Sequence, residues 1–254
     1  WSYPMEKYPL PEGGWVLNSL DGDLIIDNEN DLIHVCHTTT VGSLPTRIYS
    51  DILTLDMNGD KVDDYWATRT DVYDIYGLAL AIDEEGNVYV GRTGNWSNWG
   101  NPNWNWGINS LVDVYGPDRT YVDTFGDYAW DAEMDLFGYV ERIAYNPENG
   151  YLYILDKGYD MTKVFLGSRF RPDRIAVFTP TGDYQYSLLG YYQDKLECDY
   201  WALSDVDVDQ AGYVYIADAS NYRIHKVDSN DVPVTSWGGY GLGDGLFEYG
   251  PMSV

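Results

Sequence analysis

One internal repeat limits what this chain can fold into more than any other feature of its sequence. Four segments share a template in which an apolar run, a turn rich in polar residues and Gly, and a second apolar run follow one another. They are Leu24–Val35, Leu80–Val90, Ile143–Ile154 and Val206–Ile216. Short runs of β-branched and aromatic residues around a tight turn are typical of β-hairpins. The repeat therefore predicts four similar hairpins, one about every 60 residues.

A second hairpin is predicted after each of the first. Its leading strands are Ile52–Leu55, Leu111–Val114, Ile175–Phe178 and Ile224–Val227, each followed by a turn that contains Gly, Asn or Asp. Two consecutive hairpins make a four-stranded antiparallel sheet, which is the blade of a β-propeller. Because no segment keeps a helical period, the sequence predicts an all-β protein, a β-propeller of four-stranded blades of which four are visible.

The predicted blades lie at about residues 22–66, 76–126, 140–190 and 202–241, and residues 246–254 are expected to begin a further blade. We interpret residues 1–254 as a single propeller domain, truncated at its C-terminal end. An open arc of four blades would expose strand edges and the faces of its end blades. We therefore expect a longer natural chain, with a homo- or hetero-oligomer that completes the ring as the alternative.

The fourth unit resembles an NHL repeat. Residues Val208–Val227 match that repeat almost throughout, and Trp237–Phe247 resembles the glycine-rich run that links one NHL blade to the next. The other three units match more loosely. Because NHL propellers commonly have six blades, the resemblance implies that these four blades belong to a six-bladed ring. It implies little about activity, since the family contains binding modules, structural proteins and a few lyases.

The charge balance excludes two classes of partner. The chain has 41 Asp and Glu against 15 Lys and Arg, a formal net charge of −26. Such a field repels nucleic-acid phosphates and anionic membranes, and no run approaches the roughly 20 apolar residues of a membrane span. We expect an extracellular or cell-surface protein with protein subunits or glycans as partners. Cys36 and Cys198 form either one disulfide or two separate buried thiols.

Long inserts between the strands are where binding residues are expected, because loops on a rigid scaffold carry function. The most distinctive insert, residues 94–107, holds Trp96, Trp99, Trp104 and Trp106 among Asn and Gly. Trp faces stack on sugar rings, and Asn amides bond to hydroxyls. The insert therefore predicts a ligand-binding platform. The alternative is that these side chains cap the propeller or pack on a neighbouring protein.

One loop has a residue pattern like that at the start of a calcium-binding loop. Oxygen-bearing residues alternate around a Gly in this loop, and the predicted ligands are Asp56, Asn58, Asp60, Asp63 and Asp64. Two interpretations stay open. The loop binds calcium, the only cofactor that we expect, or it is an ordinary hairpin turn in which Asn58 and Gly59 form a type I′ pair.

A second group of candidate ligand-binding residues lies on the innermost strands. Asp207 stands where the other blades have Ile25, Ala81 and Ala144, Asp205 has the same parity, and Arg142 is the counterpart of Asp205 one blade earlier. An unpartnered buried carboxylate is costly. We therefore expect Arg142, Asp205 and Asp207 to cluster near the propeller axis, as a binding site, as a structural ion pair or as the lining of a water-filled channel.

Catalysis has little support in the sequence. The three histidines, His34, His37 and His225, do not fall one to a blade as a zinc-type site would require, and no nucleophile elbow or phosphate loop occurs. The leading hypothesis is thus a non-catalytic binding and assembly module. A calcium-dependent propeller hydrolase or lyase at the central channel is the first alternative. A structural subunit of an extracellular filament or sheath is the second.

Overall fold

The computed structural model describes residues 15–19, 23–42, 47–62, 66–67, 75–96, 107–126, 137–157, 173–188 and 203–254. These residues form sixteen strands in four antiparallel sheets of four strands each. The described part of the chain contains no helix, and so none long and apolar enough to cross a membrane. The fold is the all-β blade architecture of a β-propeller, as predicted.

Sheet 1 contains β1 (Trp15–Ser19), β2 (Leu24–Asp27), β3 (Leu32–Gly42) and β4 (Arg47–Asp56). β3 is long enough to pair with β4 along one side and with two short strands on the other. β2 pairs with its first half and β1 with its second half. The sheet therefore takes in β1, which precedes the start at residue 22 that we expected for the first blade.

The other three sheets have the plain order in which each strand pairs with the next one along the chain. Sheet 2 contains β5 (Ile75–Ile82), β6 (Val88–Trp96), β7 (Gly107–Tyr115) and β8 (Tyr121–Phe125). Sheet 3 contains β9 (Val140–Asn146), β10 (Tyr151–Asp156), β11 (Arg174–Phe178) and β12 (Tyr184–Ser187). Sheet 4 contains β13 (Leu203–Val208), β14 (Val214–Asp218), β15 (Arg223–Val227) and β16 (Pro233–Gly238).

The first hairpin of every sheet is closed by the same side-chain hydrogen bond. An Asx oxygen at the end of the innermost strand accepts the backbone N–H two residues further on, at 3.0–3.1 Å. The four residues are Asp27, Asp83, Asn146 and Asp209. An Asx turn of this kind lets a polar side chain replace a backbone turn bond, which explains why the repeat template keeps Asp or Asn at this position.

The second hairpin of sheet 1 corrects one sequence-based expectation. A type I′ turn requires positive φ at both central residues, but of Asn58 and Gly59 only Gly59 has a positive φ, of 86°. The backbone bonds from Gly59 N to Asp56 O and from Asp56 N to Asp60 O form a three-residue loop instead. Such a loop needs one left-handed residue, which glycine supplies without strain.

Each sheet carries a buried pair of a basic side chain and an aspartate, between β3 and β4 in sheet 1 and between the second and third strands in sheets 2 to 4. The pairs lie at 2.7–3.3 Å, and all eight side chains are at most 6% exposed. They are His37–Asp51, Arg92–Asp113, Asp156–Arg174 and Asp218–His225. Burial of a charge is tolerated only with such a partner, so each pair links the two strands that carry it.

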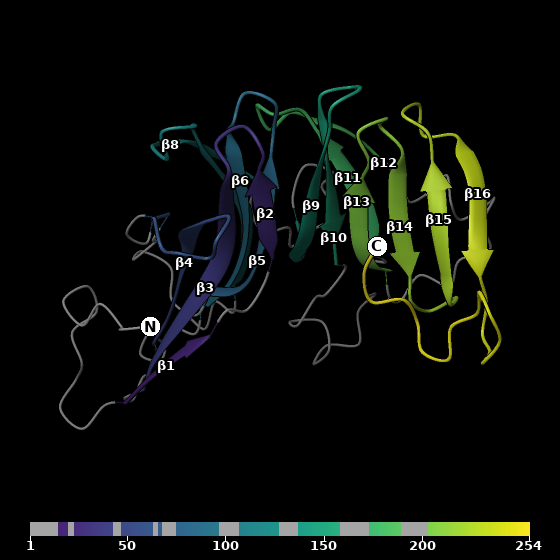
Figure 1. Ribbon diagram of the computed structural model, residues 1–254, viewed down its shortest axis with the longest axis horizontal. Helices are drawn as coiled ribbons and strands as arrows, with labels where there is room; N and C mark the ends of the chain where they lie inside the picture. Colours follow the sequence, from purple (N-terminus) through teal and green to yellow (C-terminus); the bar gives the residue numbers. More distant parts are fainter. Residues whose placement is uncertain are drawn as a thin grey trace.

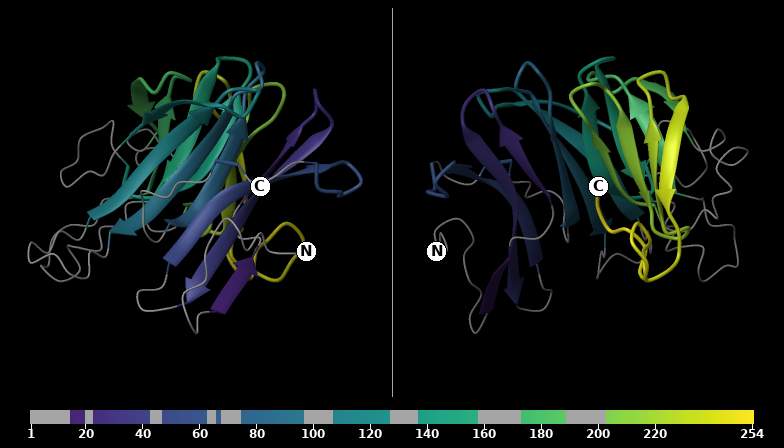
Figure 2. Two further views of the ribbon diagram at one scale, coloured as in Figure 1. Left: turned by 90° about the vertical axis from the view of Figure 1, so that its left-hand side faces the viewer. Right: turned by 45° about the vertical axis from the view of Figure 1, so that its right-hand side comes forward.

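Neighbouring sheets pack face to face through three apolar clusters. One joins sheets 1 and 2 around Ile52 and Leu80, one joins sheets 2 and 3 around Tyr89 and Leu152, and one joins sheets 3 and 4 around Leu155, Ile175 and Ile216. The sheets follow one another in an open arc rather than a closed ring (Figure 1). The innermost strands β2, β5, β9 and β13 lie side by side along the arc (Figure 2).

The two ends of the sheets differ in their connections. We call one the turn end, because both hairpins of each sheet close there with short turns. We call the other the connection end. There β6 leads to β7, β8 to β9, β10 to β11 and β12 to β13, through the long inserts expected from the sequence. The innermost strands of sheets 2 to 4 begin at the connection end.

Candidate functional site

One position of the repeat brings charged side chains to the start of the innermost strands. The residue just before the first apolar residue of the template is Asp23 in sheet 1, Ala79 in sheet 2, Arg142 in sheet 3 and Asp205 in sheet 4. Because adjacent innermost strands run side by side, this position forms a row across the arc near the connection end. We call Asp23, Arg142 and Asp205 the axial cluster.

Arg142 connects sheets 3 and 4. Its Nε lies 3.3 Å from Asp205 Oδ1, and the Arg142 side chain is 30% exposed whereas that of Asp205 is 10% exposed. The positive charge of Arg142 also acts on Asp23, whose carboxylate repels that of Asp205. The cluster therefore presents one accessible guanidinium between two largely buried carboxyl groups.

The two carboxylates of the axial cluster have equivalent backbone partners. Asp23 Oδ2 accepts the N–H of Leu80 in the next sheet at 3.2 Å, and Asp205 Oδ2 accepts the N–H of Val254 at 2.9 Å. The other oxygen of each accepts the N–H of the next residue along the chain. Val254 therefore occupies the same place relative to β13 that Leu80 occupies relative to β2. Each carboxylate links an innermost strand to the segment beside it.

Burial sets the protonation behaviour of these two aspartates. Desolvation raises the pKa of Asp23 and of Asp205 above the ordinary value, and the backbone donors and Arg142 oppose that rise. Burial disfavours the charged form of a carboxyl group. Each group is therefore held by hydrogen bonds in a site that partly resists its ionisation.

Asp207 does not join the axial cluster. Its side chain is exposed, and its carboxylate accepts the N–H of Val208, the next residue along the chain, at 2.8 Å. The surrounding protein still desolvates the carboxyl group enough to raise its pKa, and repulsion from Asp205 and Asp209 adds to that effect. Of the three residues predicted near the axis, the structure brings Arg142 and Asp205 into contact and leaves Asp207 apart; their ligand-binding role stays a prediction.

The Trp-rich insert belongs to the same end of the sheets. Trp96 is the last residue of β6, where its backbone pairs with Gly107 at the start of β7. Trp99, Trp104 and Trp106 lie outside the described residues. β6 ends five residues beyond Gly91, which pairs with Ala79 in the row of the axial cluster, so the insert follows a strand that runs past this row toward the connection end.

The calcium prediction is only partly covered by the described residues. Asp56 Oδ1 accepts the N–H groups of Asn58 and Asp60, at 2.9 and 2.8 Å, which lowers the pKa of Asp56. Asp228 accepts two N–H groups in the same way in the corresponding turn of sheet 4. Asp63 and Asp64 lie outside the described residues. Within those residues no group of three or more His, Cys, Asp or Glu side chains could hold a metal, and calcium binding stays a prediction.

Cys36 is a core residue of β3. Its side chain is 1% exposed and packs with Ile52 and Leu80, and burial raises the pKa of its thiol to about 12. A thiol with so high a pKa is inert at neutral pH. Cys198 lies outside the described residues, so the choice between a disulfide and two thiols stays open.

Sequence reasoning missed Asp23 as a member of the axial cluster. The repeat template was read from its first apolar residue, Leu24, and Asp23 stands just before it. Aligning that preceding position across the four units would have placed Asp23 beside Arg142 and Asp205. The repeat thus contains the information that places Asp23 in the cluster, one residue before the first residue of the template.

No protein-family model matches this chain, and no curated protein matches it. The NHL resemblance thus stays a prediction.

Several solved structures are similar. A luciferin-regenerating enzyme shares 13% identity, with a TM-score of 0.47 over 88% of this chain and 80% of that chain. Regucalcin from Agrobacterium tumefaciens, a calcium-binding protein, shares 10% identity, with a TM-score of 0.43 over 85% and 73%. Virginiamycin B lyase from Staphylococcus aureus shares 10%, with a TM-score of 0.39 over 87% and 73%. Sequence identities and TM-scores this low say nothing about the ligand or the activity of this chain.

Proposed function

We propose that this chain is a non-catalytic binding module of the NHL propeller type, located outside the cell or on its surface. Its connection end engages a glycan or a protein subunit. The observation that carries the proposal is the state of the axial cluster, where an accessible Arg142 lies beside carboxylates that already hold backbone N–H groups. Such a cluster can orient a partner's polar groups while keeping its own geometry.

Hydrolysis or elimination at the axial cluster is less well supported. A general acid or base must reach the reacting atom with a proton or a lone pair. Asp205 Oδ1 is shared between Arg142 and the N–H of Val206, and Oδ2 is bonded to the N–H of Val254. Asp23 is engaged with two backbone donors in the same way. These carboxylates support blade junctions, which favours a positioning role over proton transfer.

A glycan is the partner class that the connection end suits first. The insert between β6 and β7 is rich in Trp and Asn, which stack on sugar faces and bond to hydroxyl groups. The net charge of −26 repels polyanions at long range. A neutral polysaccharide, or a neutral glycan on a protein subunit, is therefore a better ligand for the connection end than an acidic polymer. In this proposal a further blade or a subunit completes the ring.

A glycan array tests the proposal. Labelled full-length chain is compared with a triple variant, Trp99→Ala, Trp104→Ala and Trp106→Ala, and with the control Trp237→Ala. Trp237 is 42% exposed on β16, away from the insert. We expect wild type and control to bind the same neutral glycans. The triple variant should lose about tenfold or more in affinity, since an aromatic ring contact contributes about 0.5–1.5 kcal/mol beyond its buried area and about 1.4 kcal/mol is a factor of ten.

The same array separates binding from catalysis. Bound glycans are incubated with wild type and with Asp207→Asn, and released sugars are measured by mass spectrometry. No release from any glycan supports the binding module. Release of sugar by wild type would overturn the non-catalytic proposal in favour of an enzyme, whether or not it persists in Asp207→Asn, and equal binding by the triple variant would overturn the role of the insert.

A further inference from the structure

One row of side chains crosses the first three strands of sheets 2 and 3 on the face that is turned toward the next sheet along the chain. We call this face the forward face and the row the forward row. Its six members are at most 7% exposed, and the larger ones pack in apolar clusters with the next sheet. They are Ala81, Tyr89 and Val114 in sheet 2, and Ala144, Tyr153 and Val177 in sheet 3.

The forward row of sheet 4 departs from this pattern at two of its three positions. Backbone pairing places Asp207, Tyr215 and Lys226 directly opposite one another. The tyrosine is kept, but an aspartate replaces the alanine and a lysine replaces the valine. Asp207 is exposed, and the Lys226 side chain is 23% exposed. Because burial of an unpartnered charge is costly, this face is unsuited to a junction made by apolar packing alone.

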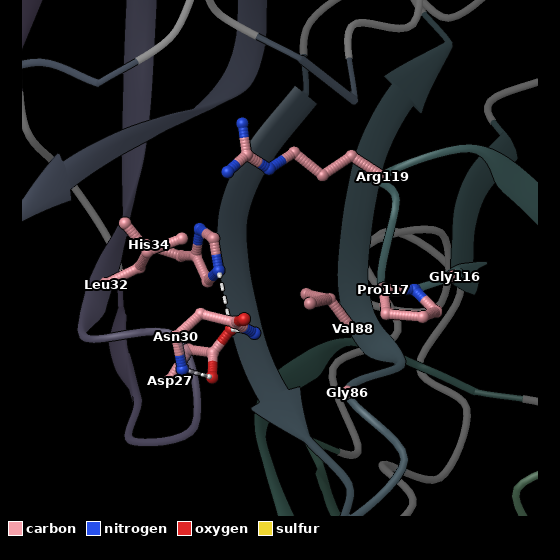
Figure 3. A pocket seen from close by; sticks show the side chains of 9 residues that line it. All are labelled: Asp27, Asn30, Leu32, His34, Gly86, Val88, Gly116, Pro117 and Arg119. Atoms are coloured by element: carbon pink, nitrogen blue, oxygen red, sulfur yellow. Dashed lines mark hydrogen bonds and ion pairs between the residues drawn. The ribbon is translucent and has the colours of Figure 1, made fainter.

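The junction of sheets 1 and 2 shows how the fold accommodates a polar forward row. In sheet 1 this row holds His34 and Thr54, whose Nδ1 and Oγ1 atoms are 2.9 Å apart. A pocket of about 310 Å³ opens beside His34, lined by Asp27 of sheet 1 and by Arg119 of the facing sheet (Figure 3). The charges of both residues act on His34. A polar row is therefore met by charged groups from the element that faces it.

The charge of Lys226 is balanced within sheet 4. Its Nζ donates to Tyr215 Oη at 2.7 Å, lies 3.7 Å from the centroid of the Tyr213 ring and is 4.0 Å from Asp209 Oδ2. Tyr215 Oη in turn donates to Asp209 Oδ2 at 2.9 Å. An ammonium group over an aromatic ring is stabilised by the negative face of that ring. Lys226 thus orders two tyrosine side chains on the forward face of sheet 4.

The charge of Asp207 is not balanced in the same way. Its Oδ1 accepts the N–H of Val208 at 2.8 Å. Desolvation raises the pKa of Asp207, and the two charges that add to this effect, those of Asp205 and Asp209, are both negative. A cation beside Asp207 would relieve this repulsion. A guanidinium suits the place best, because it pairs with a carboxylate through two parallel hydrogen bonds and stacks on aromatic rings.

A second copy of this chain does not complement the forward face of sheet 4. The free face of sheet 1, on the side of β2 opposite to Ile25, is apolar, with Leu24 56% and Ile26 44% exposed. Contact between these two free faces would bury Asp207 and Lys226 against aliphatic side chains, which offer no partner to either charge. The two ends of the arc therefore do not match each other.

We propose that the forward face of sheet 4 is an interaction surface for a different protein, whose facing side carries arginine. An arginine of that partner pairs with Asp207 and packs beside Tyr215. The net charge of −26 attracts a basic surface at long range and speeds its approach. The forward row contains no residue of the Trp-rich insert, so this inference does not rest on the proposed glycan platform.

An NMR titration with short peptides tests the inference on the full chain. The probe is a capped pentapeptide with two arginines. The comparison peptide has citrulline at both places, which keeps the shape of arginine without its charge. We expect the arginine peptide to shift the amide signals of Asp207, Val208 and Tyr215 in a saturable way and to bind about threefold more tightly, since an accessible charge pair contributes a factor of a few. Equal binding of the two peptides, or no shift at these residues, would overturn the proposal.

A pair of variants locates the binding. Asp207→Asn is expected to lower the affinity for the arginine peptide to that of the citrulline peptide. Asp123→Asn is the matched control and should leave the affinity unchanged. Asp123 is also an exposed strand residue whose carboxylate accepts the N–H of the next residue, Thr124, at 2.8 Å. Thermal unfolding checks that both variants are folded. Equal affinity of Asp207→Asn and wild type would place the peptide elsewhere and overturn the assignment.

The same spectra, recorded without peptide at several protein concentrations, test the choice of partner. Because the two free faces do not match, the amide signals of Leu24 and Asp207 should not depend on concentration. Signals of both residues that shift together as the concentration rises would mean that a second copy occupies the forward face of sheet 4. That result would overturn the assignment to a different protein.

Discussion

Arg142 Nε lies 3.3 Å from Asp205 Oδ1, and the two residues hold the same repeat position in adjacent sheets. The pair therefore ties β9 to β13 at the point where both strands begin. Arg142 is 30% exposed and Asp205 is 10% exposed. One partner is thus accessible to a ligand while the other is held by the fold, which is the arrangement on which the proposed binding role depends.

The Arg142–Asp205 pair is expected to contribute little to stability. Partly exposed ion pairs usually contribute about 1 kcal/mol or less, so a double-mutant cycle with Arg142→Ala and Asp205→Asn should give a coupling energy of that size. Urea unfolding of the four proteins measures it. A coupling of about 3 kcal/mol or more would mean that the pair is chiefly structural and would weaken its assignment to binding.

The Arg92–Asp113 pair is expected to behave differently. Arg92 Nε lies 2.7 Å from Asp113 Oδ2, and the 2% exposed side chain also donates to Ser50 O on β4 and to Ala67 O, which follows sheet 1 in the chain. Arg92→Leu removes the positive charge beside the buried carboxylate of Asp113, so we expect a loss of about 3–5 kcal/mol in the free energy of unfolding. Arg223→Ala, on the exposed side of β15, is the control and should cost under about 1 kcal/mol. Equal losses would refute this account.

Gly91 marks a close approach between sheets 2 and 3. A Cβ at this position would lie 2.4 Å from Val140 Cγ1 and 3.0 Å from Ile143 Cδ1, although the backbone itself is unstrained. Gly91→Ala should therefore lower the free energy of unfolding by about 1–3 kcal/mol. Gly243→Ala meets only Leu246 Cδ1 at 3.5 Å and should be near neutral. Thermal unfolding compares the two, and a neutral Gly91→Ala would contradict the packing between these sheets.

His34 should make the fold sensitive to acid. Burial and the charge of Arg119 lower its pKa to about 4, while Asp27 opposes the shift. Because the unfolded chain binds the proton more tightly, stability falls as pH drops from about 6.5 toward about 4. We expect His34 to account for about 1–2 kcal/mol of the loss between pH 7 and pH 5. Urea unfolding of wild type and His34→Gln at both pH values measures this share.

A second measurement checks the cause of the His34 shift. Arg119→Gln removes the nearby positive charge, so the pKa of His34 should rise from about 4 toward its ordinary value. An NMR titration of the imidazole reports the change. A pKa of His34 near 6.5 in wild type, or one that falls in Arg119→Gln, would contradict the described surroundings of the pocket.

The fold was open to prediction because its signals are local and repeated. The Asx turns at Asp27, Asp83, Asn146 and Asp209 recur at one template position, and each is visible in sequence as Asp or Asn after an apolar run. β1 was not predicted. It pairs with the far half of β3 and lies before the repeat, so its place depends on a tertiary contact.

The sites were less accessible to sequence reasoning. Arg142 and Asp205 were paired in advance because the repeat aligns them, whereas Asp23 preceded the compared segment. The pocket at His34 could not be recognised, because Asp27 and Arg119 come from different sheets. The left-handed backbone of Arg119 also has no clear sequence signal, since φ values above zero are uncommon outside glycine.

The most direct test of the binding role is hydrogen–deuterium exchange of the full chain with a glycan identified on the array. The account predicts slower exchange at the connection end, in residues 97–106 and around Asp23, Arg142 and Asp205, with the turn end unchanged. Protection confined to the turn end, or no change at the connection end under saturating glycan, would contradict it.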